Sequence, residues 1–251
     1  GCYKLYEVYD LREEKKSDNS CLGSYAKDIY ETEDKPSKII EYEGFYFYVN
    51  GEEIELLAYN GDDKTITTPE SYKGNKYKIA NYAFYGSGAT NIVISEGATS
   101  IGEHAFFNRQ SLQSVTLPNT ITSIGMNAFY QCSALKEITI PSSVTSIGSE
   151  AFGVCNSLSS VKILGEIPPT LEGENTFLTD GYLKIYVPYK YLNDYKNNEF
   201  WRQYSDIDII MSDTSSFEVE GITYVLDKLT KEVWVSKRKD DKKYTGEVTI
   251  P

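Results

Sequence analysis

Apolar residues recur through the middle of the chain with a period of 22 to 23 residues. The pair Ala-Phe starts at Ala83, Ala105, Ala128 and Ala151, at intervals of 22, 23 and 23 residues. Two further columns keep the same step, an isoleucine before each pair (Ile79, Ile101, Ile124, Ile147) and a leucine after three of them (Leu112, Leu135, Leu158). Such a period is typical of solenoids, in which one repeat forms one coil and buries its apolar face only against its neighbours.

The order of apolar positions within one repeat predicts three short pieces of structure. The alternation in Leu-x-x-Ile-x-Ile predicts a strand whose apolar side chains point inward. Val-x-x-Ile-Gly predicts a second extended piece that turns at the glycine, and Ala-Phe-x-x-Cys-x-x-Leu predicts an irregular or 3₁₀-like turn. Stacked coils place equivalent strands roughly 4.8 Å apart in a parallel sheet. We therefore expect a continuous aromatic column, the phenylalanine spine, made of Phe84, Phe106, Phe129 and Phe152.

The repeat unit resembles the BspA-like (Treponema-type) leucine-rich repeat, most clearly in "SVTLPNTITSIGMNAFYQCSALKEITIP" at 114–141. The resemblance covers residues 74–164. It implies a mostly β solenoid, with short parallel strands and irregular turns, from a bacterial surface or secreted protein. It also implies binding to components of host or neighbouring cells. This function comes from the family and not from the spacing.

Five segments follow from where the period starts and stops. We expect residues 1–38 to be the tail of a preceding array and 39–69 to be a β-hairpin that leads into the repeats, with a turn at Asn50-Gly51. Residues 70–164 carry the regular repeats. Residues 165–216 form a degenerate coil and a strand–helix cap, in which Trp201 covers the last apolar face. Residues 217–251 resemble 39–69 and start a further array, so both termini are expected to cut through a longer protein.

Charge and hydropathy narrow the range of partners. A net charge of −12 disfavours nucleic acid, because the phosphate backbone repels an acidic surface. No apolar run is long enough to span a bilayer. The resemblance implies a protein or glycan partner on host or neighbouring cells, and an extracellular or bacterial cell-surface location.

The reactive side chains are expected to be structural, so the sequence predicts no enzyme, no cofactor and no metal site. The only histidine, His104, lies in a variable column and is expected to be exposed. Cys132 and Cys155 share one column and are expected to be buried thiols. Arg109 occupies that column one coil earlier, which suggests that the column is not uniformly buried. Two acidic pairs, Asp62-Asp63 and Asp206/Asp208, are interpreted as solvated charge, with a weak calcium site as the alternative. Whether Cys2 and Cys21 pair is left open.

Two sets of side chains are candidates for a partner surface. Thr116, Thr139 and Lys162 point outward on the predicted sheet, and Tyr85, Phe107 and Tyr130 occupy one column beside the spine. Aromatics favour interfaces, but beside a repeat core they also serve as packing. The preferred interpretation is a non-catalytic, adhesion-type protein- or glycan-binding module. A structural spacer that projects other domains is the alternative, and a carbohydrate-active domain is the less favoured one, because no pair of carboxylates is evident.

Overall fold

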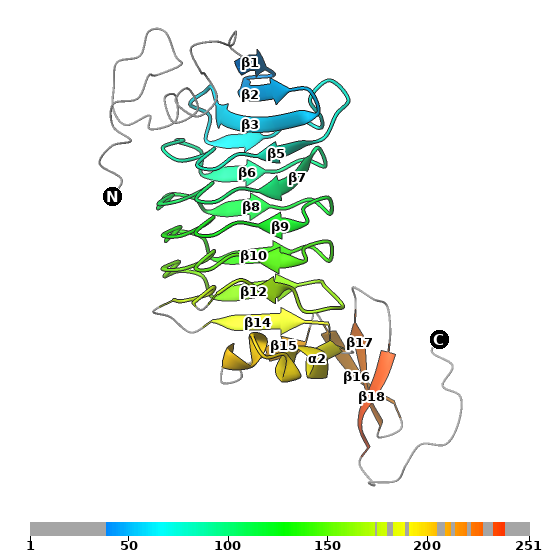
Figure 1. The fold of residues 1–251 in the computed structure, drawn as a ribbon. Coiled ribbons are helices and arrows are strands. Elements are labelled where there is room, and N and C mark those ends of the chain that lie inside the picture. Colours follow the sequence, from blue (N-terminus) through cyan, green and yellow to red (C-terminus); the bar gives the residue numbers. More distant parts are fainter. Residues whose placement is uncertain are drawn as a thin grey trace.

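The computed structural model describes residues 39–173, 175–179, 183–188 and 191–204 in full. It describes four later strands, 209–211, 214–219, 222–227 and 233–238, by their backbone. Figure 1 shows the coils stacked one below another along a single axis from β3 to β14. The chain is therefore a mostly β solenoid, as its period predicts.

One face of the solenoid is a parallel sheet built from the Val-x-x-Ile pieces. We call it the serine sheet, after the outward Ser100, Ser123 and Ser146. Its strands, in spatial order, are β3 (Glu53–Tyr59), β5 (Tyr77–Ile79), β7 (Ala98–Ile101), β9 (Ser123–Ile124), β11 (Ser146–Ile147) and β13 (Thr170–Leu171). The isoleucine that ends each of β5 to β11 is buried. The sequence predicted these pieces to be extended, and the structure joins them in a hydrogen-bonded sheet.

The Leu-x-x-Ile-x-Ile pieces form the other face, which we call the threonine sheet. It consists of two parallel groups, β4 (Thr65–Thr67), β6 (Asn91–Val93) and β8 (Ser114–Thr116), then β10 (Glu137–Ile140), β12 (Ser160–Ile163), β14 (Lys184–Val187) and β15 (Ile209–Met211). β8 and β10 follow one another down the stack (Figure 1). Register is maintained across coils, since Ile138 pairs with Val161 and Val161 with Ile185. This is the parallel sheet that the repeat predicts.

The Ala-Phe turn connects the two sheets within each coil and contains the spine. The rings of Phe84, Phe106, Phe129 and Phe152 are fully buried and stack with centroids 4.7 to 5.0 Å apart and planes within 5° of parallel. The backbone joins the coils here too. The amides of Phe84, Phe106 and Phe129 each donate to the carbonyl of the alanine one coil later, as in Phe106 N to Ala128 O at 2.7 Å, and the Phe152 amide donates to Thr176 O. The predicted spine is confirmed.

An antiparallel meander covers the first coil. β1 (Ile39–Tyr42) pairs with β2 (Phe45–Asn50), and β2 pairs with β3 before β3 joins the serine sheet. The predicted turn at Asn50-Gly51 is wrong by one residue. Asn50 is the last residue of β2 and pairs with Glu53, so the turn residues are Gly51 and Glu52. Gly51 takes the left-handed conformation (φ +66°), which costs little without a Cβ atom.

Phe177 and Trp201 close the other end of the stack. Phe177 lies 5.3 Å from Phe152 and nearly parallel to it, so Thr176-Phe177 extends the spine by one degenerate coil. Trp201, in the 3₁₀ helix η3 (Trp201–Tyr204), is fully buried 5.9 Å from Phe177. Its Nε1 donates to Pro169 O at 2.7 Å. Tyr195, in the helix α2 (Leu192–Asn197), donates its hydroxyl proton to Gly165 O. The predicted capping role of Trp201 is confirmed.

Two positions of the repeat adopt a left-handed backbone, and the residues there are not glycine except for Gly86 in the first coil. One column is Tyr82, His104, Asn127, Glu150 and Asn175, with φ between 52° and 61°, and the other is Asn108, Gln131 and Val154, with φ between 56° and 59°. Asparagine tolerates this conformation best among residues with a Cβ atom, and a β-branched residue tolerates it poorly. Val154 is therefore a strained position in an otherwise regular coil.

Replacing Phe129 by alanine removes one fully buried ring from the middle of the spine. We expect the free energy of unfolding to fall by about 3 to 5 kcal/mol, because both stacked neighbours lose a partner and a cavity remains. Chemical denaturation of the variant and the wild-type chain measures the difference. A loss below about 1 kcal/mol would contradict the close packing of the spine.

Replacing Val154 by asparagine relieves backbone strain. We expect a gain of about 1 kcal/mol in stability, because Asn108 already occupies the equivalent position two coils earlier. Gln131→Asn is the matched control and should gain less, since glutamine is not β-branched. Equal effects of the two substitutions in chemical denaturation would argue against strain at Val154.

Candidate functional site

Tyr85, Phe107 and Tyr130 are brought together as a second aromatic column outside the spine. Their rings are half-buried, with centroids 6.2 Å apart for Tyr85 and Phe107 and 5.5 Å for Phe107 and Tyr130. The last two are almost parallel, at 7°. Tyr130 lies over Gly153, where an added Cβ would come within 2.9 Å of the ring. The ring faces of Phe107 and Tyr130 are thus largely covered, and the column presents mainly ring edges. It favours packing over a face-stacking site for sugars.

His104 flanks this column and is less exposed than its variable column predicts. Its ring stacks on Tyr82 at 4.7 Å and 12° and lies 5.3 Å from Phe107. Its Nε2 is 3.2 Å from the side-chain nitrogen of Asn127, and its Nδ1 is buried with no hydrogen-bond partner. Burial lowers the pKa of His104 below its ordinary value, partly opposed by the Glu103 carboxylate. The prediction of an exposed histidine is wrong, because the column varies in side chain but shares one left-handed backbone that turns the ring onto the preceding coil.

Thr116, Thr139 and Lys162 lie side by side on the threonine sheet as predicted, on strands β8, β10 and β12. Thr139 and Lys162 are partners in the parallel ladder. Thr116 and Thr139 are exposed, and Lys162 is half-exposed. The row continues to Tyr186 on β14, which pairs with Lys162. The sequence contained a signal for Tyr186, since Leu183, Ile185 and Val187 alternate as inward positions. The row forms a flat and mostly polar strip.

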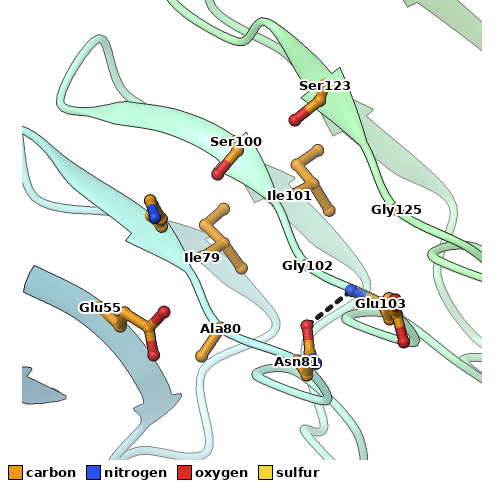
Figure 2. Close-up of a pocket in the computed structure, with 11 residues that line it drawn as sticks. Glu55, Ile79, Ala80, Asn81, Ser100, Ile101, Gly102, Glu103, Ser123 and Gly125 are labelled. Atoms are coloured by element: carbon orange, nitrogen blue, oxygen red, sulfur yellow. Dashed lines mark hydrogen bonds between the residues drawn. The ribbon is translucent and has the colours of Figure 1, made fainter. Parts of the chain in front are cut away.

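A groove of about 280 Å³ lies on the serine sheet and was not foreseen from the sequence. Figure 2 shows Ser100 and Ser123 projecting from the neighbouring strands β7 and β9, with Glu55 on β3. Asn81 and Glu103 stand in the turns beyond the strands, where the Glu103 amide donates to Asn81 Oδ1 at 2.8 Å. Lys78 completes the charged part of the lining. Hydroxyl, amide, carboxylate and ammonium groups here suit hydrogen bonding to an extended polar chain.

Glycines form the floor of the groove, because the backbones of neighbouring coils approach closely at this corner. A Cβ at Gly102 would lie 2.7 Å from the carbonyl carbon of Ala80, and one at Gly125 would lie 2.7 Å from the amide of Glu103. No side chain fits at these distances. The groove therefore follows from the glycine column, and its outer wall follows from the serines two residues before the glycines, Ser100 and Ser123.

Cys132 and Cys155 are buried thiols, as predicted. Each donates to the carbonyl of the spine phenylalanine one coil earlier. Cys132 Sγ donates to Phe106 O at 3.2 Å, and Cys155 Sγ donates to Phe129 O at 3.0 Å. Burial raises the pKa of the Cys132 thiol well above its ordinary value. Cys155 is fully buried as well, so both thiols are held inside the stack.

Arg109 is buried in the same column, so the expectation that this column is partly exposed is wrong. Its Nη2 donates to Ala89 O at 2.7 Å, and burial lowers the pKa of the guanidinium. Ala89 stands where later coils have Leu112 and Leu135, and its segment is one residue shorter. Because the coil of Ala89 lacks a large side chain at this position, the stem of Arg109 can occupy the interior. Its guanidinium then bonds to the shortened segment that ends at Ala89.

The predicted acidic sites gain no support as metal centres. Asp63 accepts a hydrogen bond from the Tyr59 hydroxyl. Within the part of the chain that the structure describes, no three His, Cys, Asp or Glu side chains are grouped to hold a metal ion. Asp206, Asp208, Cys2 and Cys21 lie outside the described residues. Among the described helices, none has the length and apolar character needed to cross a membrane.

These features belong to a known repeat family. The family model described as the BspA type leucine rich repeat region matches residues 77–203 in six copies. This chain belongs to the BspA-type leucine-rich repeat family. No curated protein matches its sequence.

Three solved structures are similar to this chain. The leucine-rich repeat protein of T. pallidum is 25% identical with a TM-score of 0.54, over 59% of this chain and 70% of its own. The pneumococcal vaccine antigen PcpA is 22% identical with a TM-score of 0.51, over 70% of this chain and 48% of its own. A leucine rich cell surface protein from Faecalibacterium prausnitzii is 22% identical with a TM-score of 0.48, over 83% and 64%. The likeness to the T. pallidum protein and to PcpA supports the solenoid fold.

His104 should make stability depend on pH in a defined window. Because burial places its folded pKa below the unfolded value of about 6.5, the neutral form is favoured in the fold. The contribution of the neutral His104 to stability is fully present above pH 6.5. It should be lost as the pH falls from there through the folded pKa. Unfolding midpoints at pH 7.5, 6.5 and 5.5 measure this loss. His104→Asn, which suits the left-handed backbone, should remove this part of the pH dependence. A variant with the same profile as wild type would contradict the assignment.

Proposed function

We propose that this chain is a non-catalytic binding module of the adhesion type, displayed on a bacterial surface or secreted, with a protein or glycan as partner. The observation that supports this most directly is that the cysteines, Arg109 and His104 are used for contacts within the stack, while polar side chains cover its outer faces. The thiols and the guanidinium bond to backbone carbonyls inside the stack, and the imidazole packs against neighbouring rings. The outer faces carry the polar row of the threonine sheet and the groove of the serine sheet.

Such surfaces suit a partner that makes many shallow contacts over a large area more than one that fills a single deep pocket. Equivalent side chains repeat at the spacing of parallel strands, so an extended partner can make the same contact on successive coils. The groove favours a chain that follows the solenoid axis, because Glu55, Ser100 and Ser123 line it from three strands. Membership of the family supports the surface location, since the resemblance implies bacterial surface proteins.

A structural spacer remains the second candidate function. The covered faces of Phe107 and Tyr130 favour it, because they show that this aromatic column is used largely for packing between coils. A spacer needs a stiff, regular stack and no constrained outer surface. The two functions therefore differ in what happens when outward side chains are changed.

A screen of the whole chain against immobilised glycans and host surface proteins tests the proposal. The binding function predicts at least one ligand. We expect one surface pair, Ser100→Arg with Ser123→Arg in the groove or Thr116→Arg with Thr139→Arg on the threonine sheet, to weaken its binding at least about tenfold (about 1.4 kcal/mol). Ser142→Arg is a matched control, because Ser142 is exposed in the turn between the two sheets.

The pair that abolishes binding identifies the surface. An unchanged thermal midpoint in each variant shows that the fold is intact. If no ligand binds, or if both pairs leave binding unchanged, the proposal fails and the spacer is favoured. The same preparation assayed on the glycans for hydrolysis tests the carbohydrate-active alternative, for which we expect no product.

A further inference from the structure

A second antiparallel meander follows the solenoid and has the topology of the first. β16 (Thr214–Val219) pairs with β17 (Ile222–Asp227), and β17 pairs with β18 (Val233–Arg238). The first meander runs β1-β2-β3 in the same antiparallel order. In both, two residues separate the first strand from the second, and these are Glu-Gly in each case, at 43–44 and 220–221.

The two meanders share their strand register residue by residue. Tyr42 pairs with Phe45 in the first, and Val219 pairs with Ile222 in the second. The other three pairs between β1 and β2 recur between β16 and β17 at the same offset of 177 residues (Ile39 with Tyr48, Ile40 with Phe47, Glu41 with Tyr46; Ser216 with Val225, Phe217 with Tyr224, Glu218 with Thr223).

An irregularity in the ladder also recurs at the same place. The register between β2 and β3 shifts between Tyr46 and Phe47, and that between β17 and β18 shifts between Thr223 and Tyr224. Bulges are specific features of a strand pair and do not arise from alternation alone. The shared position shows that the two meanders have the same strand arrangement and register. They differ in the loop before the last strand, which is longer in the second.

The first meander shows what this plan does. β3 offers its outer edge to the first coil strand, and Glu55 and Leu56 pair in parallel with Lys78 and Ile79 of β5. Leu56 is fully buried. Through the register, Glu55 corresponds to Trp234 and Leu56 to Val235, and Val235 keeps the apolar character of that position. Beyond the bulge the two differ, with Ser236-Lys237 in place of Leu57-Ala58, but no pair with β5 falls there.

We propose that β16–β18 is a second array-capping module, and that the edge of β18 at Trp234-Val235 accepts the strand of a repeat coil in parallel. In the described part of the chain, β18 is the outer strand of its three-stranded sheet. The occupant is a strand of the Tyr77–Ile79 type, because that is what the same register receives in the first module. This inference is independent of any ligand of the array.

Exchange of the two modules tests the proposal. In the chimera, residues 216–251 replace residues 39–69, which keeps a proline before Glu70 because Pro251 aligns with Pro69. We expect its thermal midpoint to lie within about 5 °C of the wild-type value, with slow amide exchange retained at Ile79 and Ile101. A variant that lacks residues 39–69 should unfold at lower temperature and exchange faster there. A chimera that matches this deletion would overturn the proposal.

Two substitutions in the chimera test the register. Val235→Lys places a charge where Leu56 is buried and should bring the midpoint down to that of the deletion. Trp234→Lys, the matched control at the Glu55 position, should leave it almost unchanged. Equal effects of the two would show that β18 does not dock as proposed.

A second experiment, on an extended chain, tests the proposal without the chimera. Residues 70–204 appended after Pro251 of the intact chain should form a further protected array, which hydrogen exchange detects as a second set of slow amides. Val235→Lys should abolish that protection. Fast exchange throughout the appended residues would also overturn the proposal.

Discussion

Backbone hydrogen bonds between coils set the distance at which all equivalent side chains meet. Parallel strands bond at roughly 4.8 Å, and the same spacing reappears in the spine, where phenylalanine rings stack 4.7 to 5.0 Å apart. The side chains of every column of the repeat must therefore pack at this same distance between coils. A flat aromatic ring fits it, a thiol fits it while bonding to a carbonyl, and at the corner of the coil only glycine fits, because a Cβ at Gly125 would overlap the preceding turn.

This constraint also decides which residues remain for function. Cys132, Cys155 and Arg109 are held inside the repeat, where their side chains donate to backbone carbonyls. Even the outer aromatic column mostly covers its own ring faces. Among the described residues, the surface includes two polar sheet faces. One carries a row of outward threonines, and the other is hollowed where the glycines lie. Under the proposed binding function, recognition draws on repeated modest contacts along the stack.

Column reasoning predicted the fold well, because the interior of a solenoid repeats its environment. It assigned the spine, the two buried cysteines and the cap formed by Trp201. It failed at His104 and Arg109, where a residue departs from its column. A variable column was taken as exposed, although all its members share a left-handed backbone. Arg109 was taken as a sign of exposure, although the short segment before Ala89 leaves room for its stem.

The sequence by itself determined the period, the inward columns, the stacked parallel strands and the membership in a repeat family, because each of these depends on a residue's place within its own coil. The tertiary structure alone decided the groove on the serine sheet, the covered faces of the aromatic column and the partial burial of His104. Each of these depends on residues from neighbouring coils about 22 or 23 positions apart in the chain. Their contacts are set by how closely two coils approach at a given corner, and periodicity does not contain that distance.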